Sequence, residues 1–451
     1  MKGAGAQVCA RPHTPMTPAA RLAAVAELLQ AIEATPRRPS DATANDFFRA
    51  RRFIGGGDRR VVADTLWSII RQRIRLDWHL RQARSDPSAR LLLAAYLIIA
   101  EGRGMPAIEA IYAGGKFAME PLDARERRVL AALIGKALIE PAMPAPVALN
   151  LPDWAYPLFL ARFGETLPAE MAAMEQGAPL DMRANLLRTT RDAAAVALAG
   201  EGIATTPTPF SPWGLRADGR KPVTNTEAFK AGLIEIQDEG SQLIALLTDA
   251  RPGMRVVDFC AGAAGKTLAL AATMDNRGRI TACDTSTVRL EGAVRRLRRA
   301  GVDNVERHLL EPGDKWTKRR AGSFDRVLVD APCTGSGTWR RNPDARLRTR
   351  PQDLAELTAL QQDITDRAAE LVRPGGRLVY ATCSVFTDEN DGQMQGFLER
   401  HPDFAVLPAD ALWATLRPGV EAPCAGPYLT TSPARHGTDG FFAAVLERRA
   451  P

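Results

Sequence analysis

The sequence predicts a multidomain protein in which an α-helical N-terminal domain precedes an α/β domain of the Rossmann-like type, with a mostly parallel, doubly wound sheet. Two observations support this prediction. Over residues 17–145, apolar side chains recur at three- and four-residue spacings, the period of a helix that buries one face. Over residues 236–451, short apolar runs alternate with helical segments, which is typical of a parallel sheet covered by helices.

The N-terminal elements follow from this periodicity. We expect helices at Ala19–Ile32, Arg60–Leu80, Arg90–Ala100 and Arg125–Ile139. Residues 1–16 are predicted to be a tail, because the first amphipathic run opens at Met16, and the proline-rich stretch Glu140–Pro146 predicts a linker. Residues 150–235 are predicted to be a small α+β segment with helices near Trp154–Phe163 and Pro168–Glu175 and a strand near Met182–Arg188.

Beyond residue 236 we predict five buried strands, at Arg255–Cys260, Arg279–Asp284, Phe324–Asp330, Arg377–Thr382 and Gly440–Leu446. Between them we expect helices from Lys266, over Thr287–Ala300 and over Pro351–Val372, the last ended by Pro374-Gly-Gly. The carboxyl ends of parallel strands meet at one edge of a sheet, where ligands bind. Polar residues that directly follow these strands are therefore the candidates for a functional site.

The composition excludes several classes of protein. With 45% hydrophobic and 25% charged residues, the 451-residue chain is neither disordered nor collagenous. No apolar run approaches the roughly 20 residues needed to cross a bilayer, and we find no secretory signal pattern. Six irregularly spaced cysteines without a CxxC pair indicate reduced thiols, and five scattered histidines indicate no metal site. We expect a cytoplasmic protein without bound metal.

The first predicted strand ends in a loop of small residues, Cys260–Thr267, whose backbone amides can approach a ligand at a helix N-terminus. This loop fits a phosphate-binding P-loop except that Cys260 replaces the first glycine, so an NTPase remains an alternative. Asp284 ends the next strand, where an acid commonly accepts the ribose hydroxyls of an adenosine, although it can also cap the following helix. Together they favour an adenosine-bearing cofactor.

Two cysteines follow the next strands. Cys333 lies three residues after Asp330, and Cys383 follows Thr382, each in a turn flanked by glycine, serine or threonine. Free cysteines are usually core residues, and we expect that role for Cys260 and Cys283. A thiolate is also a strong nucleophile once its pKa is lowered. Two thiols and an aspartate at an adenosine site match methylation of carbon 5 of a pyrimidine, which needs a nucleophile at carbon 6, an acid near the ring nitrogen and help with elimination.

These motifs resemble the S-adenosylmethionine-dependent RNA cytosine-5 methyltransferases of the Sun/Fmu (RsmB/NOP) family. The resemblance is carried by Gln237–Leu243, Cys260–Thr267, Asp330–Cys333, Ala381–Cys383 and Asp439–Phe442, and more weakly by Arg183–Asn185. It implies a class I methyltransferase domain over residues 236–451. It also implies a NusB-like RNA-binding domain over residues 17–145, with residues 150–235 as an RNA-binding connection.

The resemblance implies roles for individual residues. Cys383 would be the nucleophile, Cys333 would assist release of the methylated base, and Asp330 would hold the cytosine edge beside the cofactor. The cofactor would contact Cys260, Ala261, Gly262, Ala263, Ala264, Gly265, Lys266, Asp284, Arg289, Glu311 and Asp330. The usual family loop reads Ala-Pro-Gly-Gly-Lys, whereas residues 262–266 read Gly-Ala-Ala-Gly-Lys and lack the proline and one glycine.

The charge distribution points to RNA. The formal charge of +7 conceals +6 over Arg51–Ser85 and +8 over Arg289–Arg350, and only eight of the 59 basic residues are lysine. Arginine suits phosphate because its fork offers paired donors, although solvated helix faces would look similar. Following the Cys333 turn, three arginines are predicted to contact RNA phosphates: Arg340, Arg341 and Arg346.

A target base must leave its stack to reach a thiol, so we expect the protein to bind single-stranded or locally opened RNA. We also expect a monomer. Ribosomal RNA is favoured over tRNA by the N-terminal resemblance. The alternative is a non-catalytic RNA-binding ribosome-assembly factor that retains the fold. A DNA methyltransferase is disfavoured, because its nucleophile would be the Pro-Cys cysteine.

Overall fold

The computed structural model describes residues 15–115, 117–219, 221–424 and 426–450. Most of the predicted tail, residues 1–14, lies outside the described residues. The chain forms two compact units, one holding the chain up to Tyr156 together with Pro343–Arg348, the other holding Pro157–Asn342 and Thr349–Pro451. The first unit thus extends past the predicted linker and includes a short segment from the C-terminal half. None of the described helices is long and apolar enough to cross a membrane.

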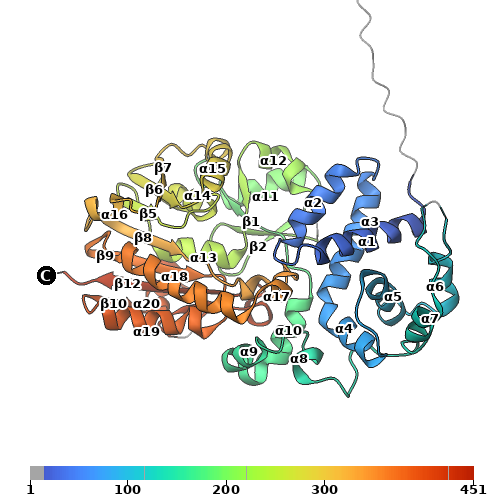
Figure 1. Cartoon of the computed structure of the whole chain (residues 1–451). Coiled ribbons are helices and arrows are strands. Elements are labelled where there is room, and N and C mark those ends of the chain that lie inside the picture. The colour runs from blue at the N-terminus through green and yellow to red at the C-terminus, as the bar shows by residue number, and fades with distance from the viewer. Residues whose placement is uncertain (1–14, 116, 220, 425, 451) are drawn as a thin grey trace, which may run out of the picture. The chain divides into compact units, whose positions relative to one another are not determined.

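The first unit is helical (Figure 1). Its helices are α1 (Pro18–Glu33), α2 (Ser40–Ala50), α3 (Gly56–Arg71), α4 (Arg73–Gln82), α5 (Ala89–Ile99), α6 (Met105–Ile111), α7 (Ala124–Ala131), α8 (Ala145–Ala148) and α17 (Ala345–Arg348). Their apolar faces form one core around residues such as Leu28, Leu66 and Leu92. The prediction of one helix over Arg60–Leu80 is wrong, because the backbone leaves the helical region at Gln72, where neither proline nor glycine marks the break.

The second unit opens with a small antiparallel sheet in the strand order β2-β3-β1-β4. Its strands are β1 (Asp181–Ala184), β2 (Thr205–Pro207), β3 (Gly214–Ala217) and β4 (Ile234–Ile236). Helices α9 (Tyr156–Phe163) and α10 (Leu167–Glu175) precede the sheet in the chain, and α11 (Arg191–Gly200) and α12 (Glu227–Lys230) lie between its strands in the sequence. One face carries Met182 and Ala184, which pack on Ala194 and Leu198 of α11. Strand β1 is buried on both faces, although its other face is charged.

The larger sheet has the strand order β10-β12-β9-β8-β5-β6-β7, with β11 beside β12. Its strands are β5 (Arg255–Asp258), β6 (Arg279–Asp284), β7 (Val305–Leu309), β8 (Phe324–Asp330), β9 (Val372–Thr382), β10 (Phe404–Leu407), β11 (Leu429–Thr431) and β12 (Phe441–Arg448). Strands β5 to β9 pair in parallel, whereas β10, β11 and β12 are antiparallel to their neighbours. The chain order reverses between β5 and β8, and in open α/β sheets ligands bind at the carboxyl ends of the strands at such a point. The predicted fold class is confirmed.

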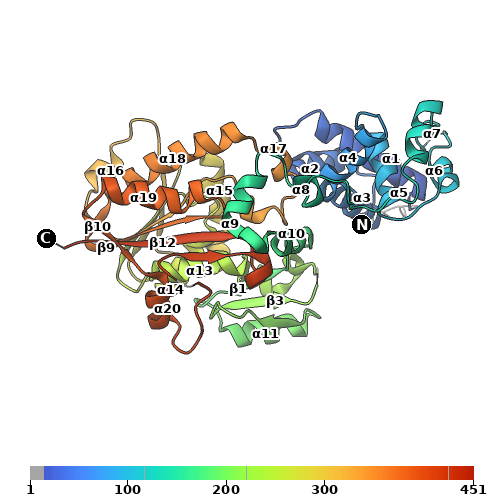
Figure 2. The same ribbon diagram turned by 90° about the horizontal axis from the view of Figure 1, so that it is seen from below.

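Helices cover both faces of this sheet (Figure 2). They are α13 (Glu239–Thr248), α14 (Gly265–Thr273), α15 (Thr287–Ala300), α16 (Trp316–Arg319), α18 (Pro351–Ala369), α19 (Asp391–Arg400), α20 (Ala409–Leu416) and α21 (Pro433–His436). Apolar residues of α13, α14 and α20 form the core on one face, and those of α18 and α19 form the core on the other. The predicted helix over Pro351–Val372 is too long, because α18 ends at Ala369 and β9 already begins at Val372.

Candidate active site

The loop after β5 is held from two sides. Its Gly262 backbone N–H donates to Asp284 Oδ2 at 2.9 Å, so the acid at the end of β6 fixes the turn. Behind the loop, the Thr267 hydroxyl donates to Asp258 Oδ2 at 2.7 Å. Helix α14 then begins at Gly265 without a side-chain cap, so its first backbone N–H groups stay available to a ligand.

Ala264 adopts a backbone conformation that usually requires glycine. Its φ of +64° lies in the left-handed region, which costs an L-residue about 1 kcal/mol. Its methyl group is buried against Leu268, Ala293 and Leu297. The burial of this methyl group offsets part of the strain, and the turn forms without the glycine that the family loop carries.

The remaining predicted cofactor residues lie along the ends of β6 and β7. Asp284 Oδ1 also accepts from the Ser286 N–H at 2.8 Å, and Ser286 rather than Asp284 caps α15 by accepting from the Arg289 N–H. The Arg289 guanidinium is largely exposed, 3.9 Å from Asp284. Glu311 is exposed and lines a cavity of about 730 Å³ with Thr285 and Leu310. These residues share the edge at which the loop opens.

The two predicted catalytic cysteines are brought together by the ends of β8 and β9. The Cys333 and Cys383 sulfurs lie 3.4 Å apart, and both residues are half-buried. The hydrogen bond to Cys383, together with burial, raises the pKa of Cys333 well above its usual value, so Cys333 keeps its proton and serves as the donor. The pair is thus a protonated thiol beside a second sulfur.

An ion pair lies beside the cysteines. The Lys266 ammonium donates to Asp330 Oδ2 at 2.6 Å. Burial works against the charged form of Lys266, but Asp330 and the nearby Cys383 outweigh it, and the pKa of Lys266 is raised. The site therefore contains a fixed positive charge close to Cys383.

A buried polar frame supports the cysteine turns, and the sequence did not reveal it. Glu389 accepts hydrogen bonds from the Thr334 N–H at 2.8 Å, the Thr334 hydroxyl at 2.5 Å and the Gln361 amide at 3.0 Å. Ser336 and Ser384 bond to each other at 2.9 Å. Glu389 is six residues from Cys383, but only the return of the chain places it under the Cys333 turn. No spacing rule signals that contact.

Two glycines let three loops meet at the cysteines. The Gly337 N–H donates to the Cys383 carbonyl at 3.0 Å, and the Gly440 N–H donates to the Gly337 carbonyl at 2.9 Å. A Cβ atom on Gly337 would lie 2.1 Å from the Gly440 oxygen. The Asp439–Phe442 motif therefore contributes to the site through its backbone.

Two family models match the chain. The model described as 16S rRNA methyltransferase RsmB/F matches residues 245–447, and the ferredoxin-like domain of RsmF/B-like methyltransferases matches residues 151–224. A probable ribosomal RNA small subunit methyltransferase B of Synechocystis sp. is 34% identical over 304 residues, which cover 66% of this chain and 67% of that protein. The chain belongs to the RsmB/F methyltransferase family.

Other relatives agree with this family. The ribosomal RNA small subunit methyltransferase B of Erwinia tasmaniensis is 28% identical over 419 residues, covering 89% of this chain and 93% of that protein. The crystal structure of PH0851 shares the fold, with a TM-score of 0.76 and 24% identity over 96% of this chain and 99% of that one. A methyltransferase homologue from Pyrococcus horikoshii aligns with a TM-score of 0.58 and 29% identity over 69% of this chain and all of that one. The resemblance to the Sun/Fmu type is confirmed.

Two of the three arginines predicted to contact RNA phosphates are buried in this RsmB/F-family chain. Arg340 is 5% exposed and pairs with Asp439, and the Arg341 guanidinium binds Asp238 at 2.6 Å and also Asp439. Arg346 is 1% exposed and donates to the Asn150 carbonyl within the first unit. The RNA assignments of Arg340 and Arg346 are therefore wrong, because these side chains are buried donors to partners within the protein.

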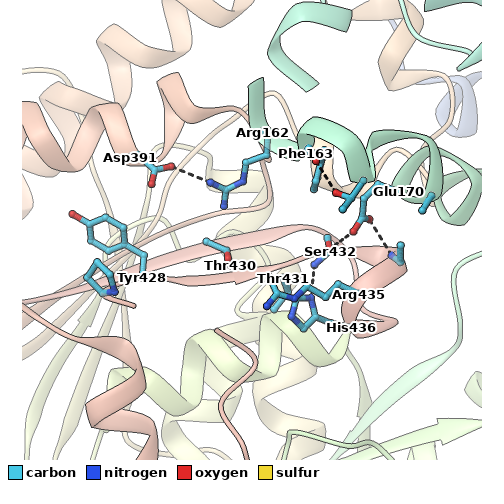
Figure 3. Close-up of a pocket in the computed structure, with 14 residues that line it drawn as sticks. Arg162, Phe163, Glu170, Asp391, Tyr428, Thr430, Thr431, Ser432, Arg435 and His436 are labelled. Atoms are coloured by element: carbon cyan, nitrogen blue, oxygen red, sulfur yellow. Dashed lines mark hydrogen bonds and ion pairs between the residues drawn. The ribbon is translucent and has the colours of Figure 1, made fainter. Parts of the chain in front are cut away.

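A second cavity of about 710 Å³ lies between α9, α10, β11 and α21 (Figure 3). Arg162 pairs with Asp391 across it at 3.3 Å, and the exposed Arg435 also lines it. Buried Glu170 holds one wall by accepting from the Ser432 hydroxyl at 2.6 Å and the Ala434 N–H at 3.0 Å. Arg162 and Arg435 thus line a cavity that also includes Asp391, which lies two residues after Glu389 in the sequence.

Proposed function

We propose that this RsmB/F-family chain transfers a methyl group from S-adenosylmethionine to carbon 5 of a cytosine in RNA, with ribosomal RNA as the favoured substrate and Cys383 as the covalent nucleophile. The observation that carries the proposal is the pair of sulfurs 3.4 Å apart, beside the Lys266–Asp330 ion pair. The names of the relatives support ribosomal RNA as the substrate class.

The residues at the strand ends fit the proposed cofactor. The uncapped N-terminus of α14 and the loop 260–266 suit its amino-acid part, Asp284 suits the ribose and Glu311 the adenine edge. When bound, S-adenosylmethionine supplies an electrophilic methyl group. A P-loop NTPase is disfavoured, because Lys266 binds Asp330 instead of remaining free for a phosphate.

The chain's own groups support nucleophilic addition by Cys383. The Cys333 S–H and the Lys266 ammonium both stabilise a thiolate at Cys383, which adds to carbon 6 of the cytosine. One carboxylate oxygen of Asp330 accepts from the Lys266 ammonium, and the other can accept a hydrogen bond from the cytosine edge. At elimination a solvent water takes the carbon 5 proton, the electron pair of that bond re-forms the double bond between carbons 5 and 6, and the bond between carbon 6 and sulfur breaks. The Cys333 S–H stabilises the departing Cys383 thiolate.

Covalent trapping tests the two cysteine roles. RNA containing 5-azacytidine should form an SDS-resistant complex with the wild-type chain and with Cys333→Ala, but not with Cys383→Ala. Cys333→Ala should also accumulate adduct with ordinary RNA, because release is impaired. Trapping by Cys383→Ala but not by Cys333→Ala would reverse the two roles. Bisulfite sequencing of the product RNA then identifies the methylated cytosine.

The strained Ala264 favours one second candidate function, a ribosome-assembly factor that retains the fold without turnover. Calorimetry with S-adenosylmethionine separates the two. Micromolar affinity supports the enzyme, whereas no binding at millimolar cofactor, with RNA binding retained, supports the assembly factor.

For RNA contact, we propose the exposed Arg435 in place of the buried arginines. Arg435→Ala should weaken binding of a short single-stranded RNA several-fold and lower the salt slope of the binding constant by about 1. Arg298→Ala, on the exposed face of α15, is the matched control. Equal losses for both variants, measured by fluorescence anisotropy, would show only a general effect of charge.

A further inference from the structure

The small sheet buries a charged face. Arg183 and Glu235 are cross-strand partners in β1 and β4, and they point away from the apolar face that carries Met182. All but one of the charges on this face have an ionic partner. Arg216 binds Asp181 with two bonds of 2.7 and 2.8 Å, and Glu235 pairs with Arg296 at 3.2 Å and with Arg299.

Arg183 is the exception. The residue is 2% exposed, and its Nε donates to Gln237 Oε1 at 2.8 Å. Among the residues that the structure describes, its two terminal amino groups have no hydrogen-bond partner, and neither is fully enclosed. Burial lowers the pKa of Arg183 to about 10, so the side chain remains charged near neutral pH. The Glu235 carboxylate attracts this guanidinium without bonding it, so its burial is only partly offset, and an anion that binds the two terminal amino groups would offset the rest.

The surrounding contacts place Arg183 close to the loop after β5. Glu235, its cross-strand neighbour, pairs with Arg296, and the other arm of Arg296 donates to the Ala263 carbonyl at 2.7 Å. The Glu235–Arg296 ion pair therefore connects the cross-strand neighbour of Arg183 to the loop, which leads into the uncapped N-terminus of α14. Its partner Gln237 also bonds Ser241 of α13, which fixes the direction of the guanidinium.

We propose that Arg183 binds an oxyanion beside this loop, and that the oxyanion is the carboxylate of the amino-acid part of S-adenosylmethionine. A guanidinium with both terminal amino groups free is suited to a bidentate carboxylate contact. The assignment rests on the proposed function for the identity of the donor. An RNA phosphodiester presents the same oxyanion chemistry and is the second source to be distinguished.

The test is a cycle of two proteins and two ligands, measured by calorimetry on the full chain. Arg183→Met should weaken S-adenosylmethionine binding at least tenfold. Decarboxylated S-adenosylmethionine, which lacks the anion, should bind the wild type and the variant equally. The melting temperature of the unliganded variant should not fall, because replacing an unpaired buried cation by an apolar side chain removes an unfavourable burial.

Arg216→Met is the matched control, because it removes an arginine from the same face that already has a carboxylate partner. It should lower the melting temperature by leaving the buried Asp181 unpaired, with S-adenosylmethionine affinity unchanged. Equal losses of both ligands in Arg183→Met, or a fall in its melting temperature like that of Arg216→Met, would indicate a structural role and overturn the proposal.

RNA binding tests whether the oxyanion at Arg183 is instead an RNA phosphodiester. If cofactor affinity is unchanged but an unmodifiable oligoribonucleotide binds more weakly, with a salt slope smaller by about 1, the oxyanion is a phosphodiester. If Arg183→Met leaves the affinities for both the cofactor and the RNA unchanged, the proposed oxyanion site is overturned. If the wild type binds neither cofactor, the proposed methyl transfer fails, and the RNA comparison alone then decides the role of Arg183.

Discussion

The candidate site is framed by the cysteine turns after β8 and β9 and by the loop after β5, and these two regions differ in how firmly they are held. At the ends of β8 and β9, the cysteine turns are held by Glu389, by paired serines and by the Gly337–Gly440 backbone contact. At the end of β5, the loop is held by the Asp284 carboxylate, which accepts from the Gly262 N–H, and by Arg296, which donates to the Ala263 carbonyl, and it contains the strained Ala264. Under the proposed function, attack at a single ring atom needs a fixed sulfur, whereas a loop that binds a cofactor through several backbone groups tolerates small shifts.

The largest effect is expected at the cysteine end, in Glu389→Gln. One of three donors to this buried carboxylate then faces an amide NH₂ group, and we expect a loss of about 3 kcal/mol in the free energy of unfolding. The measurement is urea denaturation. Glu399→Gln on the exposed side of α19 should change it by less than about 0.5 kcal/mol. Similar changes in the free energy of unfolding for both variants would contradict the argument that the hydrogen bonds of Glu389 hold the cysteine turns firmly.

Gly337→Ala tests the backbone contact itself. Its methyl group would lie 2.1 Å from the Gly440 oxygen, so the loops must separate at a cost of about 1–3 kcal/mol. We expect reduced covalent trapping by Cys383 as well as a lower melting temperature. Gly292→Ala in α15 meets nothing within 4 Å and should stabilise the helix slightly. Full trapping activity in Gly337→Ala would show that the thiol geometry tolerates this shift.

A pH dependence is expected beneath the loop. Burial raises the pKa of Asp258 from 3.8 to about 7. The folded protein therefore binds this proton more tightly than the unfolded chain does, and the contribution to stability falls as pH rises from about 4 to about 7. Relative to the wild type, Asp258→Asn should show a flatter decline of melting temperature over this window. A parallel pair of curves would contradict the shifted pKa.

The smallest effect is expected for Ala264→Gly. Relief of the left-handed strain gains about 1 kcal/mol, and loss of the buried methyl group costs about 0.8 kcal/mol, so the net change in unfolding free energy should be close to zero. S-adenosylmethionine affinity should stay within about threefold. A loss above about 2 kcal/mol would show that this loop is packed as tightly as the cysteine turns, and the contrast between the two ends would disappear.

The sequence by itself determined the strands, the loop and the cysteines at one sheet edge. Apolar periodicity and the residues that end each strand are short-range features, and parallel strands must bring such ends together. This reasoning found Cys333, Cys383 and Lys266. In the larger sheet it missed β7 and β10, the two edge strands, and β11, which is three residues long.

Only the tertiary structure decided which charges are paired. Arg340 lies 99 residues from Asp439, and Arg341 lies 103 residues from Asp238, so no local pattern could show that carboxylates neutralise them. The same long-range packing placed Glu389 under the Cys333 turn and buried Arg183 with its terminal amino groups bonded to none of the described residues. The free energy of a charge depends on what surrounds it after folding, whereas a strand end is already defined by its neighbours in sequence.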